Sequence, residues 1–378
     1  MSKKQKRVSI PKEVVLKLWA LTAGRCEFLG CNKPLWRDGL TWQEANFAHI
    51  AHIIAASSDG PRGDKKLSRK LAKDFSNLML VCLKHHKLID TKKYEKKYTV
   101  ELLRSYKQSH EQRIYTQTSM KEEMKTTILI FKAKVGDRMV DIPFFHTVEA
   151  VAPRFPADDK GIILDYTNLD ASTNKNYWEN LKSQIKCDIK LYLKNPHDIK
   201  HLSIFAIGPI PLLIYLGKCI GNIIPIDLYQ RHRDTQCWTW KFDKGSKNLN
   251  YIIKTRNTNS KVNKIILVLS LSGKIHLQEI KKLIPQSLPY YEITIKNPTP
   301  LFLYSKDKLV NFQKIYRELI TKIREKHGSK CQIHLFSAVP APIAVSCGKE
   351  LLPKVDPPIF VYDHVGDKQG FKYALKVN

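Results

Sequence analysis

A duplicated pattern in the second half of the chain restricts the fold more than any other feature of the sequence. A Phe, two Pro and a Gly in the segment 205–217 recur in the same order, 131 residues later, in the segment 336–348. Each segment is followed by a short apolar run, so that the repeat spans 205–229 and 336–362. A buried strand, a turn with Pro opening a helix, and a second strand make a βαβ unit. Two copies predict an α/β fold of two Rossmann-like halves with a cleft where they meet.

The composition is that of a globular, strongly basic protein. The chain has 378 residues, 43% of them hydrophobic, which is enough for two or three domains with their own cores. Lys and Arg outnumber Asp and Glu by 64 to 35, for a formal charge of +29. This excess favours polyanionic partners through phosphate neutralisation and counterion release. Simple solubility is the alternative explanation.

Targeting signals are missing from the sequence pattern. No apolar run approaches the roughly 20 residues of a membrane span. A secretory signal has an apolar stretch after its basic residues, and the basic N-terminal residues of this sequence are not followed by one. Three of the eight cysteines lie near histidines in the first 90 residues, which suits metal binding in a reducing compartment. We expect a soluble cytoplasmic protein with no membrane partner.

Two pairs of potential zinc ligands lie in the N-terminal region. Cys26 and Cys31 form a Cys-x4-Cys knuckle in which Gly30 allows a tight turn, and Cys82 and His85 are three positions apart. One zinc ion can span each pair, and together they complete the closed Cys₃His shell of a structural site. We predict a structural zinc that contributes much of the folding free energy of a small domain. Ordinary buried cysteines are the alternative.

Further candidate ligands surround the second pair. His86 and Asp90 are four positions apart in the stretch 77–90, a spacing that places two side chains on one face of a helix, where they could hold a second ion. Upstream, His49 and His52 lie in an apolar strand pattern. A single His on such a strand is usually a core residue. Two of them in this context favour a functional site.

The order His52, Asn77, His86, bracketed by the zinc-ligand pairs, resembles the HNH endonuclease family and its ββα-metal fold. The resemblance implies that His52 is the general base that activates water, that Asn77 positions the loop of the base, and that His86 binds a catalytic ion, Mg²⁺ or another divalent cation. A neutral imidazole can accept the proton of water near neutral pH. A divalent ion stabilises the charge that develops on the phosphate. We therefore expect an HNH endodeoxyribonuclease.

The sequence departs from the family pattern at one position. Many HNH sites carry an acidic metal ligand directly before the first His, whereas Ala51 stands there in this chain. His49 and Asp90 are the candidate replacements as ligands of the catalytic ion. His49 is also the alternative to His52 as the base, and His52 is preferred because it lies at the head of the loop motif at 51–64.

Basic residues near the motif are candidates for DNA contact. The stretch 51–64 resembles a subgroup of the family with a Gly-Pro-Arg loop, in which Arg62 either meets phosphate or pins the loop. Lys92 and Lys93 belong to a basic segment with interleaved tyrosines at 91–98. Such a segment is more often a solvated helix end, but beside a nuclease motif it is expected to follow the DNA backbone.

The duplicated segments carry a second resemblance. Phe-Ala-Ile-Gly-Pro-Ile-Pro-Leu-Leu-Ile-Tyr-Leu-Gly at 205–217 and Phe-Ser-Ala-Val-Pro-Ala-Pro-Ile-Ala-Val-Ser-Cys-Gly at 336–348 resemble the SAVED domain, two fused CARF-like halves that sense cyclic oligonucleotides. An HNH domain followed by SAVED is similar to the DNA-degrading effectors of CBASS antiphage defence. The resemblance implies a nuclease that is idle until a cyclic di- or trinucleotide, made by a partner cyclase, binds and drives homo-oligomerisation.

Residues for that ligand are expected at helix starts and in loops beside the repeated strands. A helix N-terminus offers backbone N–H groups to phosphate, arginines offer charge, and an indole offers a stacking face. For Trp238 and Trp240, packing in the core is an equally good explanation. The loop after the apolar run 265–269 is expected to close over the ligand. The candidates are Pro211, Arg231, Arg233, Trp240, Ser272, Gly273 and Lys274.

The predicted architecture is an α/β chain with a zinc-stapled HNH domain at 1–120, a linker and first strands at 121–144, and a SAVED domain at 145–378. Two other functions fit the same residues. One is a restriction-type HNH nuclease whose C-terminal domain recognises modified DNA bases. The other is a non-catalytic, nucleotide-sensing, DNA-binding protein whose zinc-knuckle domain only docks nucleic acid.

Overall fold

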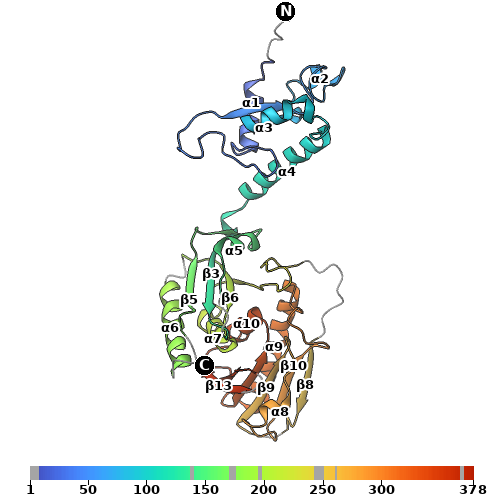
Figure 1. Ribbon diagram of the computed structural model, residues 1–378. Coiled ribbons are helices and arrows are strands. Elements are labelled where there is room, and N and C mark those ends of the chain that lie inside the picture. Colours follow the sequence, from blue (N-terminus) through green and yellow to red (C-terminus); the bar gives the residue numbers. More distant parts are fainter. Residues whose placement is uncertain are drawn as a thin grey trace, which may run out of the picture. The chain divides into compact units, whose positions relative to one another are not determined.

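The computed structural model describes residues 8–136, 140–169, 176–194, 198–241, 251–259, 262–366 and 370–378. The chain divides into two compact units, Met1–Met120 and Lys121–Asn378 (Figure 1). Each unit has its own hydrophobic core. Among the helices described, none combines the length and the apolar character needed to cross a membrane.

A ββα arrangement forms the centre of the first unit. Strand β1 (Ala48–His52) pairs antiparallel with β2 (Leu78–Cys82), and helix α3 (Leu83–Asp90) follows β2 without an intervening loop. The other α-helices of this unit are α1 (Lys12–Leu21), the short α2 (Leu67–Leu71) and α4 (Val100–Thr118). Short 3₁₀ turns occur at Phe75–Asn77 and Lys92–Tyr94.

The core of the first unit is small. It is built around the four buried residues 78–81 of β2. Three further buried leucines belong to the same cluster: Leu18 of α1, Leu35 of the loop after α1, and Leu103 of α4. A sheet of two strands is marginally stable by itself. The first unit therefore depends on contacts beyond its sheet, from the helices and from cross-links such as a bound metal.

The first half of the second unit is a parallel sheet with helical crossovers. Its strands lie in the order β5-β3-β6-β7, and the two-residue β4 also pairs with β3. The elements are β3 (Lys125–Ala133), α5 (Phe144–Ala150), β4 (Phe155–Pro156), β5 (Ile162–Tyr166), α6 (Tyr177–Tyr192), β6 (Leu202–Ile207), α7 (Ile210–Ile220) and β7 (Ile226–Tyr229). Residues 125–133 thus form the central strand of this sheet.

The second half repeats this topology. Its parallel strands lie in the order β10-β9-β11-β12, and antiparallel β8 and β13 extend the two edges. The elements are β8 (Ile252–Arg256), β9 (Lys264–Ser270), α8 (Leu277–Ile280), β10 (Tyr290–Thr294), α9 (Lys306–His327), β11 (Gln332–Ala338), α10 (Ala341–Lys349), β12 (Ile359–His364) and β13 (Phe371–Lys376). The predicted α/β class and the two βαβ units at 205–229 and 336–362 are confirmed.

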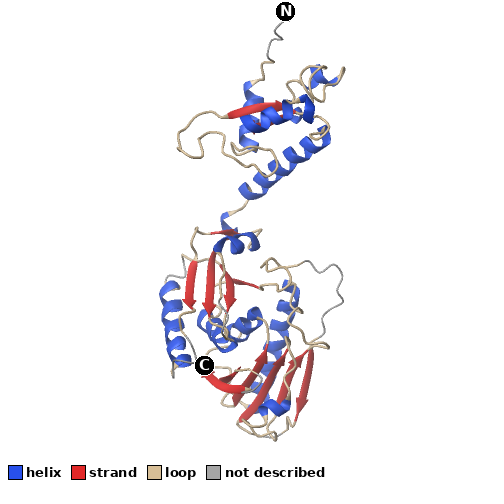
Figure 2. Cartoon of the chain, viewed as in Figure 1, coloured by secondary structure: helices blue, strands red, loops and turns tan. Residues whose placement is uncertain are grey.

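Helices α7 and α10 lie against each other between the two sheets (Figure 2). They cross at a pair of glycines. A Cβ atom on Gly217 would clash with the carbonyl oxygen of Val345, and a Cβ atom on Gly348 would clash with that of Ile214. Each contact maps onto the other by the 131-residue offset of the repeat, so the crossing has pseudo-two-fold symmetry. Only Gly permits backbones to approach this closely.

An aromatic stack also repeats in each half. The rings of Phe205 and Tyr229 lie 4.4 Å apart at an interplanar angle of 10°, and those of Phe336 and Tyr362 lie 4.4 Å apart at 19°. Each Phe belongs to the strand before a crossover helix and each Tyr to the strand after it. The repeated Phe is therefore a packing residue that fixes neighbouring strands.

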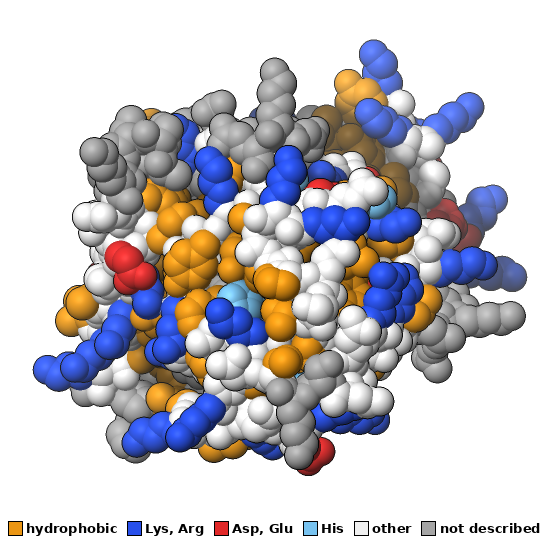
Figure 3. All heavy atoms as spheres, turned by 90° about the horizontal axis from the view of Figure 1, so that it is seen from below, with side chains coloured by type: hydrophobic (Ala, Val, Ile, Leu, Met, Phe, Trp, Pro, Cys, Tyr) orange, Lys and Arg blue, Asp and Glu red, His pale blue; other side chains and the backbone are white. Residues whose placement is uncertain are grey.

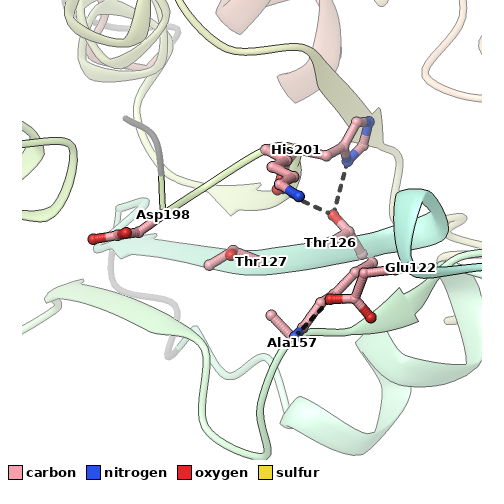
Figure 4. Close-up of a pocket in the computed structure, with 8 residues that line it drawn as sticks. Glu122, Thr126, Thr127, Ala157, Asp198 and His201 are labelled. Carbon is pink, nitrogen blue, oxygen red and sulfur yellow. Dashed lines mark hydrogen bonds and ion pairs between the residues drawn. The ribbon is translucent and has the colours of Figure 1, made fainter. Parts of the chain in front are cut away.

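A buried polar network lies where the second unit begins (Figure 4). Thr126 Oγ1, at the start of β3, lies 2.8 Å from Nδ1 of the buried His201 and 2.9 Å from Oγ of Ser203. His201 Nε2 lies 3.4 Å from Asp227 Oδ2. This network joins β3, β6 and β7 at the edge where these strands begin.

Asp227 extends the network to other elements. It binds Lys306 Nζ at the start of α9 at 2.6 Å and Arg154 Nε at 3.3 Å, and the Arg154 guanidinium donates to the carbonyl of Glu123 in the 3₁₀ turn Glu122–Met124. Burial by itself would raise the pKa of Asp227, but hydrogen bonds from His201 and Lys306 hold that pKa well below its usual range. One carboxylate thus links both halves to the segment that enters the second unit.

The glycine crossing makes a direct prediction. Gly217→Ala and Gly348→Ala should each destabilise the protein by about 3 kcal/mol, because the added methyl group meets backbone that cannot move without separating the two halves. Chemical denaturation followed by circular dichroism measures this. Gly273→Ala is the matched control, since a Cβ there meets no atom within 4 Å. Equal stability of all three variants would contradict the proposed close packing.

Candidate functional site

Four side chains of the first unit gather into a metal-binding set. Cys26 and Cys31 come from the loop after α1, Cys82 ends β2, and His85 lies in the first turn of α3. One ligand atom from each residue lies within 4.8 Å of all the others. Tetrahedral zinc with Zn–S distances of about 2.3 Å needs ligand atoms roughly 3.5–4 Å apart. The four residues fit a zinc ion.

Local contacts hold these ligands in place. Gly30 has a φ of +77°, which lets the knuckle turn, and Cys31 N donates to Phe28 O at 2.9 Å. The Phe28 ring stacks on His85 with centroids 4.0 Å apart and an interplanar angle of 3°. The backbone N–H of Cys82 donates to Cys26 Sγ at 3.3 Å. Such backbone and ring contacts orient ligands before a metal binds.

Burial sets the protonation of the ligands. It raises the pKa of the Cys26 thiol and lowers the pKa of His85, whose Nδ1 lies 3.5 Å from Cys26 Sγ and 3.3 Å from Cys82 Sγ. The imidazole is therefore in its neutral, ligating form, whereas the thiols must release protons when an ion binds.

One residue of this region was not singled out in the sequence. Glu27, next to Cys26, is 1% exposed, and its carboxylate accepts the N–H of Leu80 in β2 and lies 3.7 Å from Lys107 Nζ of α4. Burial raises the pKa of Glu27 to about 7, against the lowering effect of Lys107. An acidic residue next to a cysteine knuckle gives no signal of burial, because its partners come from distant segments.

A second set of polar side chains lies where β1 meets α3. The rings of His49 and His86 are 5.2 Å apart between centroids, and His86 Nδ1 lies 3.4 Å from Asp90 Oδ2. The predicted i, i+4 relation of His86 and Asp90 is therefore present on α3. Two imidazoles and a carboxylate are suitable ligands for a divalent transition-metal ion, and the carboxylate is a suitable ligand for Mg²⁺ that keeps several waters.

His52, the preferred base, contacts a different group through its Nε2. Successive strand residues alternate faces, so His49 and His52, three positions apart, lie on opposite faces of β1. His52 Nε2 lies 3.0 Å from the carbonyl oxygen of Ala72, beyond α2. Of the two candidates for the base, His49 is the one beside His86.

Asn77 is a buried connector between the loops of the site. It is 1% exposed, its Oδ1 accepts the N–H of Ile54 at 2.8 Å, and its Nδ2 donates to the carbonyls of Ile54 at 2.9 Å and Leu71 at 3.2 Å. The backbone carbonyl of Asn77 also accepts the N–H of Ile53. The turn that follows His52 is thereby fixed.

Arg62 adopts the loop-pinning alternative of its two expected roles. It is 9% exposed, and its guanidinium donates to the carbonyls of Ile53 at 2.6 Å, Ile89 at 3.0 Å and His52 at 3.4 Å. These bonds attach the Gly-Pro-Arg loop to β1 and α3. A guanidinium used in this way is not presented to a phosphate group. Lys92 and Lys93, in contrast, are exposed just after α3.

In the first half of the second unit, most candidate ligand residues have packing roles. Pro211 is buried in the first turn of α7, where it favours helix initiation. Trp238 is 2% exposed in a core cluster, and Trp240 is half-buried with its Nε1 donating to Leu228 O at 3.2 Å. Arg231 and Arg233 follow β7, and Arg233 is exposed.

In the second half, the loop Ser272–Lys274 begins one residue after the end of β9, and Lys274 lines a basic cavity of about 650 Å³. Figure 3 shows one face of the molecule, on which Lys and Arg side chains far outnumber Asp and Glu. The sequence analysis singled out Lys274 and none of the other basic residues that line this cavity, because those residues come from separate elements. The basic residues that line the cavity are Lys254, Arg256, Lys274, His276, Lys281 and Lys296.

The zinc assignment can be tested by metal analysis. Cys26→Ser should lower the zinc content of the purified protein from about one ion per chain towards zero and unfold the first unit, because a Cys₃His site loses a buried thiolate. The exposed Cys187→Ser is the matched control. A folded Cys26→Ser protein that retains full zinc would show that the four ligands are wrongly assigned.

Comparison with known protein families identifies a sensor domain within the second unit. Residues 185–377, more than half of the chain, match the SAVED family, described as the SMODS-associated and fused to various effectors sensor domain. No match was found among curated proteins.

Solved structures with similarity to the chain include the Acinetobacter baumannii Cap4 SAVED/CARF-domain containing receptor. Its complex with the cyclic trinucleotide 3'3'3'-cAAA is 14% identical with a TM-score of 0.46, over 76% of this chain and 61% of that one. The complex with 2'3'3'-cAAA is 13% identical with a TM-score of 0.45, over 83% of this chain and 67% of that one. The chain thus spans about three fifths to two thirds of the receptor's length. By the match over 185–377, the chain belongs to the SAVED family.

Proposed function

We propose that this protein is a metal-dependent DNA endonuclease that a cyclic oligonucleotide activates, an effector of the CBASS type of antiphage defence. The observation that carries the proposal is the ββα unit of β1, β2 and α3, which combines a Cys₃His set with His49, His86 and Asp90 on a chain that also carries a SAVED sensor domain. The resemblance of this unit to HNH nucleases supplies the reaction.

In the proposal, His86, Asp90 and His49 hold the catalytic ion. Among the described residues, the zinc set is the group whose ligand atoms all lie within 4.8 Å of one another. The ligand atoms of His86, Asp90 and His49 are less closely grouped. An ion at this position supplies charge that stabilises the phosphate and the leaving oxygen during hydrolysis. The exposure of the His86 and Asp90 side chains, 28% and 48%, leaves room for a phosphodiester to approach.

His52 is assigned as the base. The carbonyl of Ala72 can only accept a hydrogen bond, so the neutral ring carries its hydrogen on Nε2 and its lone pair on Nδ1, which can take a proton from water. Asn77 and Arg62 hold the backbone of residues 52–54, at His52 and just after it. Because His49 is the histidine beside His86, the two assignments need a direct comparison.

The surrounding charge fits a DNA substrate. Lys92 and Lys93 are exposed two residues beyond α3, and the whole chain carries a formal charge of +29. Cations that contact phosphates position a duplex without regard to its sequence. We therefore expect little sequence preference from these contacts.

The sensor is proposed to act through the two halves of the second unit. The basic cavity lined by Lys274, Lys254 and Arg256 has the charge that a phosphate-bearing ligand requires. A ligand can activate only by binding the active assembly more tightly than the idle one. We propose that this assembly is a homo-oligomer.

The base assignment predicts a specific loss. His52→Ala should lower the rate of plasmid cleavage in Mg²⁺ at least about a hundredfold, the scale of general base catalysis, while zinc content and nucleotide binding stay unchanged. His86→Ala should abolish cleavage by weakening ion binding. His146→Ala, a half-buried histidine in the second unit, is the control. If His52→Ala still cuts and His49→Ala does not, His49 is the base.

Activation is tested with a panel of cyclic di- and trinucleotides. One of them should switch on cleavage and raise the mass of the protein in solution, and Lys274→Ala should weaken its binding about tenfold or more, because a charge-assisted hydrogen bond is lost. Lys190→Ala, exposed on α6, is the control. Cleavage without any nucleotide, sensitive to base modification, would favour a restriction nuclease. DNA binding without cleavage under all conditions would favour a docking protein.

A further inference from the structure

The segment around the short helix α2 carries a dense group of positive charges. Residues 65–73 contain five basic residues and no acidic one, and all five basic residues are exposed. They are Lys65, Lys66, Arg69, Lys70 and Lys73. The segment is flanked by Asp64 and Asp74, so the formal charge of residues 64–74 is 5 − 2 = +3. The segment therefore keeps a clear excess of positive charge when its acidic neighbours are counted.

The helical backbone gathers four of these cations on one side of the segment. Lys66 and Ala72, which flank α2, also have right-handed helical backbone angles. Positions 66, 69, 70 and 73 therefore follow the spacing i, i+3, i+4 and i+7, which places side chains on one face of a helix. Ser68 and Ala72, at other positions, are buried. The four exposed cations are called here the α2 stripe: Lys66, Arg69, Lys70 and Lys73.

The two flanking carboxylates are bonded within their own turns. Asp64 Oδ1 accepts the backbone N–H groups of Lys66 and Leu67, both at 2.7 Å. Asp74 Oδ1 accepts the backbone N–H of Ser76 at 2.8 Å and also its hydroxyl. These bonds fix both ends of the segment and direct its acidic groups to nearby hydrogen-bond donors. The cations of the α2 stripe, in contrast, are exposed to solvent.

The C-terminal end of α2 is bonded to two residues of the candidate nuclease site. The carbonyl oxygen of Ala72 lies 3.0 Å from His52 Nε2, and the carbonyl oxygen of Leu71 accepts Asn77 Nδ2 at 3.2 Å. Two members of the α2 stripe directly precede and follow this pair of carbonyls in the sequence. An anion bound on the stripe therefore lies within one helical turn of the group that holds the proposed base.

The dimensions of the α2 stripe suit a run of phosphates. Positions 66–73 are separated by seven steps of about 1.5 Å, a rise of roughly 10 Å, and the phosphates of one DNA strand follow each other about every 3.4 Å along the duplex axis. The stripe is thus long enough for about three consecutive phosphates. Exposed lysines often serve solubility only, but this stripe is attached to His52 and Asn77.

We propose that the α2 stripe binds consecutive phosphates along one strand of double-stranded DNA and, through the carbonyl of Ala72, holds the His52 ring in its catalytic orientation. The four cations are positioning residues in this scheme, because they contact the DNA backbone and not the reacting atoms. The inference rests on the proposed endonuclease function and deepens it, since it names the surface that takes the DNA backbone beside the base.

Binding is tested with the full chain carrying His86→Ala, so that DNA is bound and not cut, and with a fluorescent duplex at several salt concentrations. Arg69→Ala combined with Lys70→Ala should reduce the slope of log K against log salt by about two, because two phosphate contacts are lost. Arg69→Lys combined with Lys70→Arg keeps both charges and should preserve the slope. Lys186→Ala combined with Lys190→Ala, both exposed on α6, is the matched control and should leave it unchanged.

Positioning of the base is tested in the chain that keeps His86. Single-turnover cleavage is measured at saturating duplex, with Mg²⁺ and the panel of cyclic di- and trinucleotides. The double alanine variant at 69 and 70 should cut about tenfold more slowly, because His52 is less well placed, and the charge-preserving variant should restore the rate. Weaker binding alone would not lower the rate at saturating DNA.

The outcomes separate the α2 stripe from the endonuclease proposal. An unchanged salt slope in the alanine variant would exclude the stripe as a DNA contact and leave the endonuclease proposal standing. A lower slope with a normal rate at saturating DNA would refute the link to His52. If the unsubstituted chain never cuts, the endonuclease proposal fails while the slope still decides the DNA contact. If the His86→Ala chain binds no duplex, both fail. Zinc content and circular dichroism confirm that each variant is folded.

Discussion

The close crossing of α7 and α10 is the constraint on which the second unit depends. Gly217 and Gly348 let two helix backbones touch where any side chain would separate them. Because the same positions of a repeat contact each other, the two sheets are locked about one pseudo-two-fold relation. Each half is a packed unit, and the two halves meet at this crossing. A ligand that contacts both halves could therefore move one sheet against the other through a small change at the crossing.

The first unit is stabilised in a different way. Its two-stranded sheet offers few buried residues, so cross-links between distant segments have a large share in its stability. The Cys₃His set joins the loop after α1 to the β2–α3 junction, and Glu27 joins the same loop to β2 and, through Lys107, to α4. The residues proposed for DNA hydrolysis lie on β1 and α3, the elements that these cross-links hold. A metal bound by the Cys₃His set would therefore also hold the elements that carry the candidate site.

Charged groups have two separate uses in this chain. Asp227 is partly buried and shared among His201, Lys306 and Arg154, so it links the two halves to the entering segment. Lys274 and the cations of its cavity, in contrast, lie at a surface where acidic partners are few. Ion pairs that join distant segments, as around Asp227, define structure, whereas clustered cations of the second kind attract anionic ligands.

Much of the fold could be predicted from local sequence. The repeated Phe, Pro and Gly indicated both βαβ units, and the cysteine spacing indicated the zinc-ligand set, because chelate spacing and helix-opening prolines are short-range signals. Strands were expected within the segment 121–144, but the central place of β3 in its sheet could not be predicted. Its role depends on pairing with β5 and β6, far along the chain.

The limits were sharpest at individual side chains. The sequence by itself determined which residue types are present and their spacing, including His49 and His52 on one strand and Arg62 in a Gly-Pro-Arg loop. Only the tertiary structure decided that His49 lies beside His86 and that His52 Nε2 lies against the carbonyl of Ala72. It also decided that Arg62 binds backbone carbonyls and that Trp238 is buried. The physical reason is that the direction of a side chain is set by the elements packed around it, and those elements come from distant parts of the chain.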